Sequence, residues 1–140
     1  MGVSHSDQVE SYEYDKGVRV KKMAVPETGT RSISVGIATF DPGVGLPCHI
    51  HGCEESITII EGEAFVEFGG QRIHLKPFDT SHMLAGIPHR FINASATEKM
   101  SILWVYASTD MGRTIVAPEE CSGGSSRLNP PDQNPSKTTG

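Results

Sequence analysis

The middle of this chain is a succession of short β-forming runs separated by glycine- and proline-containing turns. One run, residues 33–37 (ISVGI), alternates in hydropathy with period two, as a strand covered on one face does. Gly69-Gly70 joins two further runs with a two-residue hairpin signal. No convincing amphipathic helix interrupts the series, so we predict an all-β fold, either a sandwich or a small barrel. The predicted strands are residues 33–37, 56–60, 64–68, 71–75, 89–93 and 100–107.

The two ends of the chain differ from this middle in composition. Residues 118–140 are rich in Pro, Gly, Ser and other polar side chains, with Leu128 as the only large aliphatic. Such a segment buries too little apolar surface to offset an ordering entropy of about 1–2 kcal/mol per residue. We therefore expect a polar tail at residues 1–17, one β domain at residues 18–117 and a disordered tail at residues 118–140.

The charge balance limits the partners of this chain. It holds 12 Lys and Arg against 17 Asp and Glu, a net charge of −5 at pH 7, whereas a nucleic-acid binder needs a basic patch. No apolar run approaches the ~18 residues that span a bilayer. We therefore expect neither nucleic acid nor a membrane as partner. The polar N-terminus resembles no signal peptide and the three cysteines are an odd number, so we expect a cytoplasmic protein.

The histidines carry the strongest functional signal. On a strand, residues i and i+2 point to the same face, so His49 and His51 present two imidazoles in one direction and Ile50 points in the other. Two neutral imidazoles this close are a natural pair of metal ligands. Glu55 follows four residues later, and Gly52 permits the bend that returns its carboxylate to the same point. These residues predict a metal site.

The spacing around them resembles the first motif of the cupin superfamily. Gly43 is followed after five residues by His49-Ile50-His51. Three more residues lead to Glu55, and six more lead to Gly62. Every defined position of the motif is matched.

A second cupin-like motif begins fifteen residues after the first. Gly86, His89 and Asn93 stand at its expected positions. Phe78 replaces its opening glycine and Leu84 replaces its proline. Those two departures affect turn geometry and leave the ligand histidine in place.

The resemblance covers about residues 33–107 and implies a fold, a ligand set and a metal. The fold is a single-domain conical β-barrel, a jelly-roll-like double-stranded sheet, and small proteins of this kind commonly form homodimers. The cofactor is one divalent transition metal, with iron favoured and Mn, Ni, Cu, Co or Zn as alternatives. Four protein ligands leave open positions for water and a substrate. The implied ligands are His49, His51, Glu55 and His89.

The sequence pattern assigns no catalytic residue. A general base near the metal would have to be His82, Tyr106 or a displaced Glu54. His82 would either line the pocket or face solvent. Glu54 would take the place of Glu55 if the bend before it had a different pitch.

The cysteines predict no site of their own. Cys53 lies two residues from His51 and would be either a soft ligand of the metal or, as we expect, a loop thiol. A zinc finger built from the three cysteines fails, because Cys48 points away from the imidazoles and Cys121 lies in the expected tail.

Side-chain parity from the ligands outlines the pocket. Ile57 and Ile59 share the direction of Glu55, and Phe91 shares that of His89. Met100, Ile102, Trp104 and Tyr106 lie on one strand face, which would either shape the cavity or bury a dimer seam. Residues that alternate with the inward-facing ones point outward, which places Glu67, Arg72 and Arg90 on the outside.

The pocket is therefore mostly apolar around a cation. With no Arg or Lys forced into it, a polyphosphate substrate is disfavoured. A small organic oxygen chelator fits better, such as a diketone, an enol, a hydroxy acid or a small phenol. We predict a metalloenzyme of the dioxygenase type. The alternatives are a non-redox metal-dependent isomerase or lyase, and a non-catalytic binding or sensing cupin.

Overall fold

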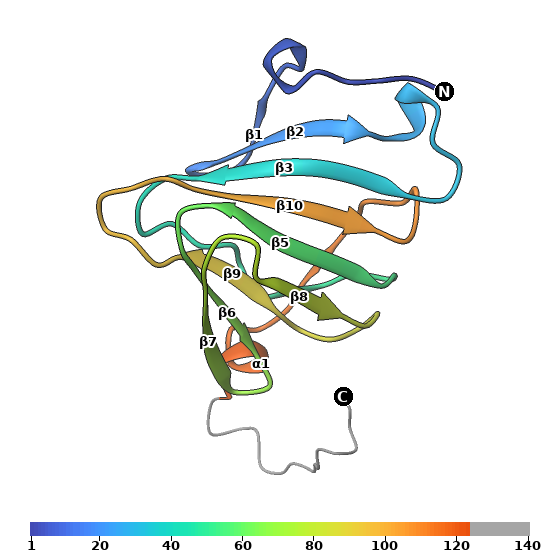
Figure 1. Cartoon of the computed structure of the whole chain (residues 1–140). Coiled ribbons are helices and arrows are strands. Elements are labelled where there is room, and N and C mark those ends of the chain that lie inside the picture. Colours follow the sequence, from blue (N-terminus) through green and yellow to red (C-terminus); the bar gives the residue numbers. More distant parts are fainter. Residues whose placement is uncertain (124–140) are drawn as a thin grey trace.

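Two antiparallel sheets enclose the apolar core of this protein (Figure 1). The computed structural model describes residues 1–123. One sheet has six strands in the order β1-β2-β3-β10-β5-β8, the second has the order β7-β6-β9, and β11 pairs with β4. The strands are β1 (Tyr12–Asp15), β2 (Val18–Ala24), β3 (Ser34–Phe40), β4 (His49–Ile50), β5 (Glu55–Glu61), β6 (Ala64–Phe68), β7 (Gln71–Leu75), β8 (Thr80–Met83), β9 (Arg90–Asn93), β10 (Met100–Tyr106) and β11 (Thr114–Ile115). The predicted all-β cupin-like fold is confirmed.

Helical structure among the described residues is confined to three short elements. They are the 3₁₀ turns η1 (Ser6–Gln8) and η2 (Pro26–Thr28) and the helix α1 (Glu119–Ser122). None of these is long and apolar enough to cross a membrane.

The core lies between the inner faces of the sheets. Along β3, and along β10 from Ile102 onward, buried side chains alternate with half-buried ones, because successive residues of a strand point to opposite faces. Phe40, Ile59, Phe91 and Met100 are at most 1% exposed, and each contributes about 1.5–3 kcal/mol by leaving water.

The N-terminal segment is more ordered than its polar composition predicts. Tyr12–Asp15 forms β1 and pairs with β2, so the sheet begins inside the expected tail of residues 1–17. The reason is that Tyr12 and Tyr14 alternate along this strand and their rings line an apolar cavity. Burial of aromatic surface offsets the cost of ordering a short segment.

The C-terminal segment also departs from the expected tail. Cys121 lies in α1, is fully buried and forms a disulfide with Cys48, with 6.0 Å between their Cα atoms. Its carbonyl accepts a hydrogen bond from the Gly70 amide. Residues 118–123 are therefore packed against the barrel, because a covalent bond and a buried side chain hold them. The remainder of the expected tail, residues 124–140, lies outside the described residues.

Candidate metal centre

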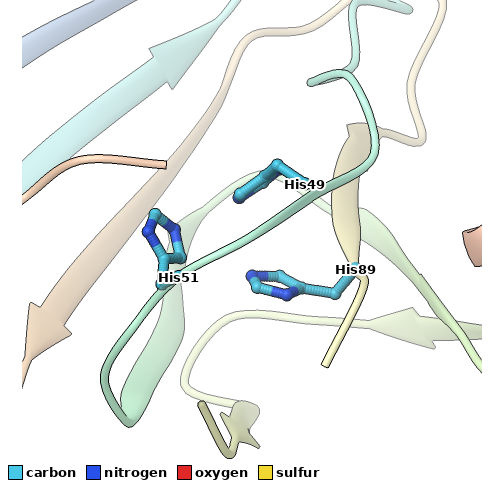
Figure 2. A group of neighbouring side chains, drawn as sticks. All are labelled: His49, His51 and His89. Carbon is cyan, nitrogen blue, oxygen red and sulfur yellow. The ribbon is translucent and has the colours of Figure 1, made fainter. Parts of the chain in front are cut away.

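The backbone brings the two histidine motifs together. His49 and His89 face each other in a β-bridge, and each amide donates to the carbonyl of the other at 3.1 and 3.0 Å. His51 follows two residues after His49, on the same face. The three imidazoles converge (Figure 2), and their donor atoms all lie within 4.8 Å of one another. All three side chains are buried.

Glu55 joins this cluster from the first position of β5. Its Oε1 lies 2.7 Å from His89 Nε2, and its Oε2 lies 3.6 Å from His51 Nε2. Glu54 points outward instead, which resolves the choice between the two carboxylates. The structure thus brings all four residues proposed as ligands to one point.

Backbone carbonyls fix the orientation of each ring. His49 Nδ1 donates to the Pro47 carbonyl at 2.8 Å, and His89 Nδ1 donates to the Ile87 carbonyl at 2.8 Å. His51 Nδ1 donates to the carbonyl of Gly112 at 3.0 Å. A carbonyl only accepts, so Nδ1 of each ring carries a proton, and in the neutral form of the ring the lone pair sits on Nε2. Hydrogen bonding of the second ring nitrogen is the usual support of a metal-binding histidine.

The converging atoms fit a cation. His51 Nε2, His89 Nε2 and Glu55 Oε1 are buried and have no hydrogen-bond partner among the described residues. Glu55 Oε1 and His89 Nε2 therefore lie 2.7 Å apart without the geometry of a hydrogen bond. Leaving such atoms unsatisfied costs about 1–3 kcal/mol each. A divalent ion between them would satisfy all three.

The environment keeps His49 neutral. Burial lowers the pKa of His49 to about 3, and the neighbouring His89 adds to this effect, while the hydrogen bond to Pro47 opposes it. A neutral imidazole is the form that binds a metal.

A mostly apolar cavity adjoins the cluster. Its water-accessible volume is about 50 Å³, it is partly open to solvent, and His49, Glu55 and His89 line it. Ile102, Trp104 and Tyr106 also line it, so this face of β10 shapes the cavity. Met100, on the same face, lies in the core.

Tyr106 is the only one of the predicted general-base candidates in this cavity. Its ring lies 4.6 Å from that of His51. Burial raises the pKa of the Tyr106 hydroxyl, and the Glu55 carboxylate raises it further. The hydroxyl therefore keeps its proton and acts as a donor.

The structure does not bring His82 to the site. It lies on β8 opposite Ser56, on the outer face of the sheet, and its ring contacts the Glu54 carboxylate. Both side chains are more than half exposed. The parity of β5 explains this, since Ser56 and its partner point opposite to Glu55. Cys53 is free and half-buried.

Sequence reasoning missed the segment that follows β10. Besides the Gly112 carbonyl, it supplies Met111 to the cavity wall. Arg113 forms a two-fold hydrogen bond to Asp15 at 2.9 and 2.7 Å and lies 4.3 Å above the Tyr14 ring. These contacts hold the segment against β1 at the cavity. No motif or periodicity in residues 107–118 signals them.

Comparison with known proteins identifies the family of this chain. A cupin domain model matches residues 36–106, half of the chain, so the protein belongs to the cupin family. Auxin-binding protein T85 of Nicotiana tabacum is 29% identical in an alignment of 87 positions, which covers 55% of this chain and 46% of that protein. The chain thus spans about half the length of the curated relatives it matches.

Solved structures show the same fold. The polyketide cyclase RemF of Streptomyces resistomycificus superposes with a TM-score of 0.75 over 87% of this chain and 89% of that chain, at 19% identity. An RmlC-like cupin from Shewanella frigidimarina gives a TM-score of 0.69 over 79% and 93% of the chains, at 17% identity. Likeness at this level of identity concerns the fold alone.

Proposed function

We propose that this cupin is a metalloenzyme of the dioxygenase type that acts on a small oxygen-chelating organic substrate. His49, His51 and His89 would bind one divalent transition metal, preferably iron, through Nε2, and Glu55 would bind it through its carboxylate. The observation that supports this most is the set of buried Nε2 and Oε1 atoms that converge without hydrogen-bond partners. Bound there, iron would supply Lewis acidity and adjacent positions for substrate oxygens and dioxygen.

The remaining residues of the site would prepare the substrate. The mostly apolar cavity wall would limit the access of water to the reacting atoms. The Tyr106 hydroxyl, protonated and next to His51, would donate a hydrogen bond to a substrate oxygen. The carbonyls of Pro47, Ile87 and Gly112 hold the imidazoles in place.

A non-redox isomerase or lyase is the second candidate. It is favoured by Tyr106, which lines the cavity and holds a proton that an enolate-type oxygen would accept. A binding or sensing cupin would use the same cavity without turnover.

Metal content and oxygen uptake separate these functions. Protein purified without added metal is analysed by mass spectrometry, and oxygen consumption is followed with diketones, hydroxy acids and catechols. Iron with substrate-dependent uptake supports the dioxygenase. Zinc or nickel without uptake supports the non-redox enzyme, and a bound but unchanged compound supports the sensor. His51→Ala and His89→Ala should lower metal occupancy while the barrel still folds, and full occupancy in either variant would contradict the ligand assignment.

We also propose a homodimer formed through the outer face of the larger sheet. Val35 and Ile37 of β3 stand opposite Val105 and Leu103 of β10, and all four are half-buried on the side away from the core. Burying this face would protect it from other partners. Light scattering of the protein and of Leu103→Asp tests this, with a dimer and a monomer as expected results.

The disulfide bears on the compartment. The cytoplasmic expectation rests partly on an odd number of cysteines, and two of these three cysteines are paired in the structure. Disulfides persist in oxidising compartments. We propose an oxidising location. Alkylation of the protein from its native source under denaturing conditions should modify Cys53 alone; modification of all three cysteines would support the cytoplasm.

A further inference from the structure

An aromatic wall runs from the metal cluster along the inner face of β10. Trp104 and Tyr106 are stacked, with ring centroids 4.9 Å apart and an interplanar angle of 26°. The Tyr106 ring in turn lies 4.6 Å from the imidazole of His51. Both rings line the cavity that contains the ligand imidazoles of His49 and His89. The two stacked rings therefore form an aromatic side of the cavity beside the metal site.

The position of the Trp104 indole is set by a glycine on the neighbouring strand. Gly36 stands opposite Trp104 in the pairing of β3 with β10. A Cβ at position 36 would lie 2.0 Å from Cζ2 of the indole. Any side chain there would displace the ring, so Gly36 allows the indole to lie against the sheet. The aromatic side of the cavity is thereby prearranged before a ligand enters.

The polarity of the cavity is uneven. No Lys or Arg is among the residues that line it, and Glu55 is its one carboxylate. The Tyr106 hydroxyl and the Trp104 indole N–H form no hydrogen bond with any residue within 1–123. A suitable ligand would be flat and apolar along the wall and would carry oxygens at the end that faces the imidazoles.

We propose that the cavity selects aromatic compounds that carry two neighbouring oxygen donors, with the ring stacked on the wall of Trp104 and Tyr106 and the oxygens at the metal. This inference rests on the metal site proposed above. Stacking between aromatic rings contributes binding free energy beyond that from the burial of apolar area. An aromatic chelator should therefore bind about three- to tenfold more tightly than a saturated chelator of the same size and donor set.

Three 2-hydroxy acids with the same chelating group test this selectivity. Mandelate carries a phenyl ring, hexahydromandelate a cyclohexyl ring and lactate a methyl group. Titration calorimetry of the zinc-loaded protein should rank mandelate first and lactate last. Trp104 is the only tryptophan of the chain, so its fluorescence should change saturably with mandelate at the same dissociation constant.

Variants locate the effect. Trp104→Leu should remove the preference of mandelate over hexahydromandelate and keep both the zinc stoichiometry and the affinity for lactate. Phe65→Leu is the matched control, because this half-buried aromatic lies on β6 against Arg72 and His74, outside the cavity lining. It should leave all three affinities unchanged. If Trp104→Leu fails to fold, the fluorescence titration of the unaltered protein decides alone.

The outcomes separate this inference from the proposed function. Zinc binding that depends on His51 and His89, with equal affinities for mandelate and hexahydromandelate, would overturn the aromatic selectivity and leave the metal site standing. An absence of zinc binding would overturn both. Mandelate binding that leaves Trp104 emission unchanged would place the ligand elsewhere and reject the inference.

Discussion

The Nδ1–H of His51 donates a hydrogen bond to the carbonyl oxygen of Gly112, 61 residues further along the chain. Through this bond the orientation of one candidate ligand depends on the segment after β10. The same segment pairs with β4 through β11 and is tied to Cys48 by the disulfide. The candidate metal site is therefore built by two cupin motifs and by a C-terminal segment outside both.

Asp110 is expected to influence the metal site through Gly112. Its Oδ1 accepts a hydrogen bond from the Gly112 amide at 2.9 Å and so fixes the turn that presents the carbonyl. Asp110→Ala should weaken zinc binding about two- to tenfold, less than the loss of a complete outer partner of a ligand. Competition with a chromophoric chelator measures this. Asp7→Ala, which removes an exposed carboxylate of η1, should have no effect, and equal affinities in all three proteins would contradict the proposed role.

The disulfide should stabilise the fold substantially. It links residues 73 positions apart, and closing a long loop of the unfolded chain contributes about 2–4 kcal/mol. The double variant Cys48→Ser/Cys121→Ser should lose this amount in urea unfolding. Cys53→Ser is the control and should lose little, since Cys53 is free. A double variant as stable as the control would show that packing alone holds α1.

The residues of the site that could be predicted are those whose spacing in the sequence fixes their direction. The two-residue period places His49 and His51 on one face, and the motif spacing adds Glu55 and His89; the structure brings these four together. The same parity places Trp104 beside Tyr106 on one face of a strand. Whether that face met a cavity or a partner depended on the neighbouring strands, which no local pattern encodes.

The parts that were missed depend on contacts between distant residues. Strand β1 is polar in sequence and becomes a strand because β2 offers an edge and the cavity accepts its tyrosines. Cys48 and Cys121 meet only after the barrel is closed, and the Gly112 carbonyl carries no side-chain signal. Glu67 does face outward as parity predicts, yet it is only 6% exposed because Arg72 and Arg90 cover it.

Glu67 should make stability depend on acid pH. Burial raises the pKa of this carboxyl. Hydrogen bonds from Arg90 and Arg72 lower the pKa by more than burial raises it, so the net pKa lies below the ordinary value. The charged form is thus favoured in the folded state, and its contribution is present above about pH 4.3, the ordinary glutamate value. It is lost as the pH falls through the lowered pKa.

Glu67→Gln should therefore lose about 1–2 kcal/mol at neutral pH, where the charge-assisted bonds are complete. Its unfolding free energy should also fall less steeply between about pH 5 and pH 3. Urea titrations at several pH values measure both effects. Glu98→Gln, a change of an exposed carboxylate, should keep the original pH profile. A Glu67→Gln profile parallel to that of the unaltered protein would mean that Arg72 and Arg90 do not hold the carboxylate charged.

Phe78 should be a site where glycine stabilises the protein. It replaces the opening glycine of the second motif and is the one described non-glycine residue with a positive φ, 74°. The left-handed conformation costs an L-residue about 1–2 kcal/mol, whereas glycine costs the folded state about 0.5–1 kcal/mol of backbone entropy. The side chain is 79% exposed, so little packing is lost. Phe78→Gly should therefore gain about 0.5–1 kcal/mol. Phe78→Ala, which removes the ring and keeps the strain, should gain nothing. Urea midpoints at an unchanged m-value compare the variants, and an equal gain in both would assign the effect to the exposed ring instead of the backbone.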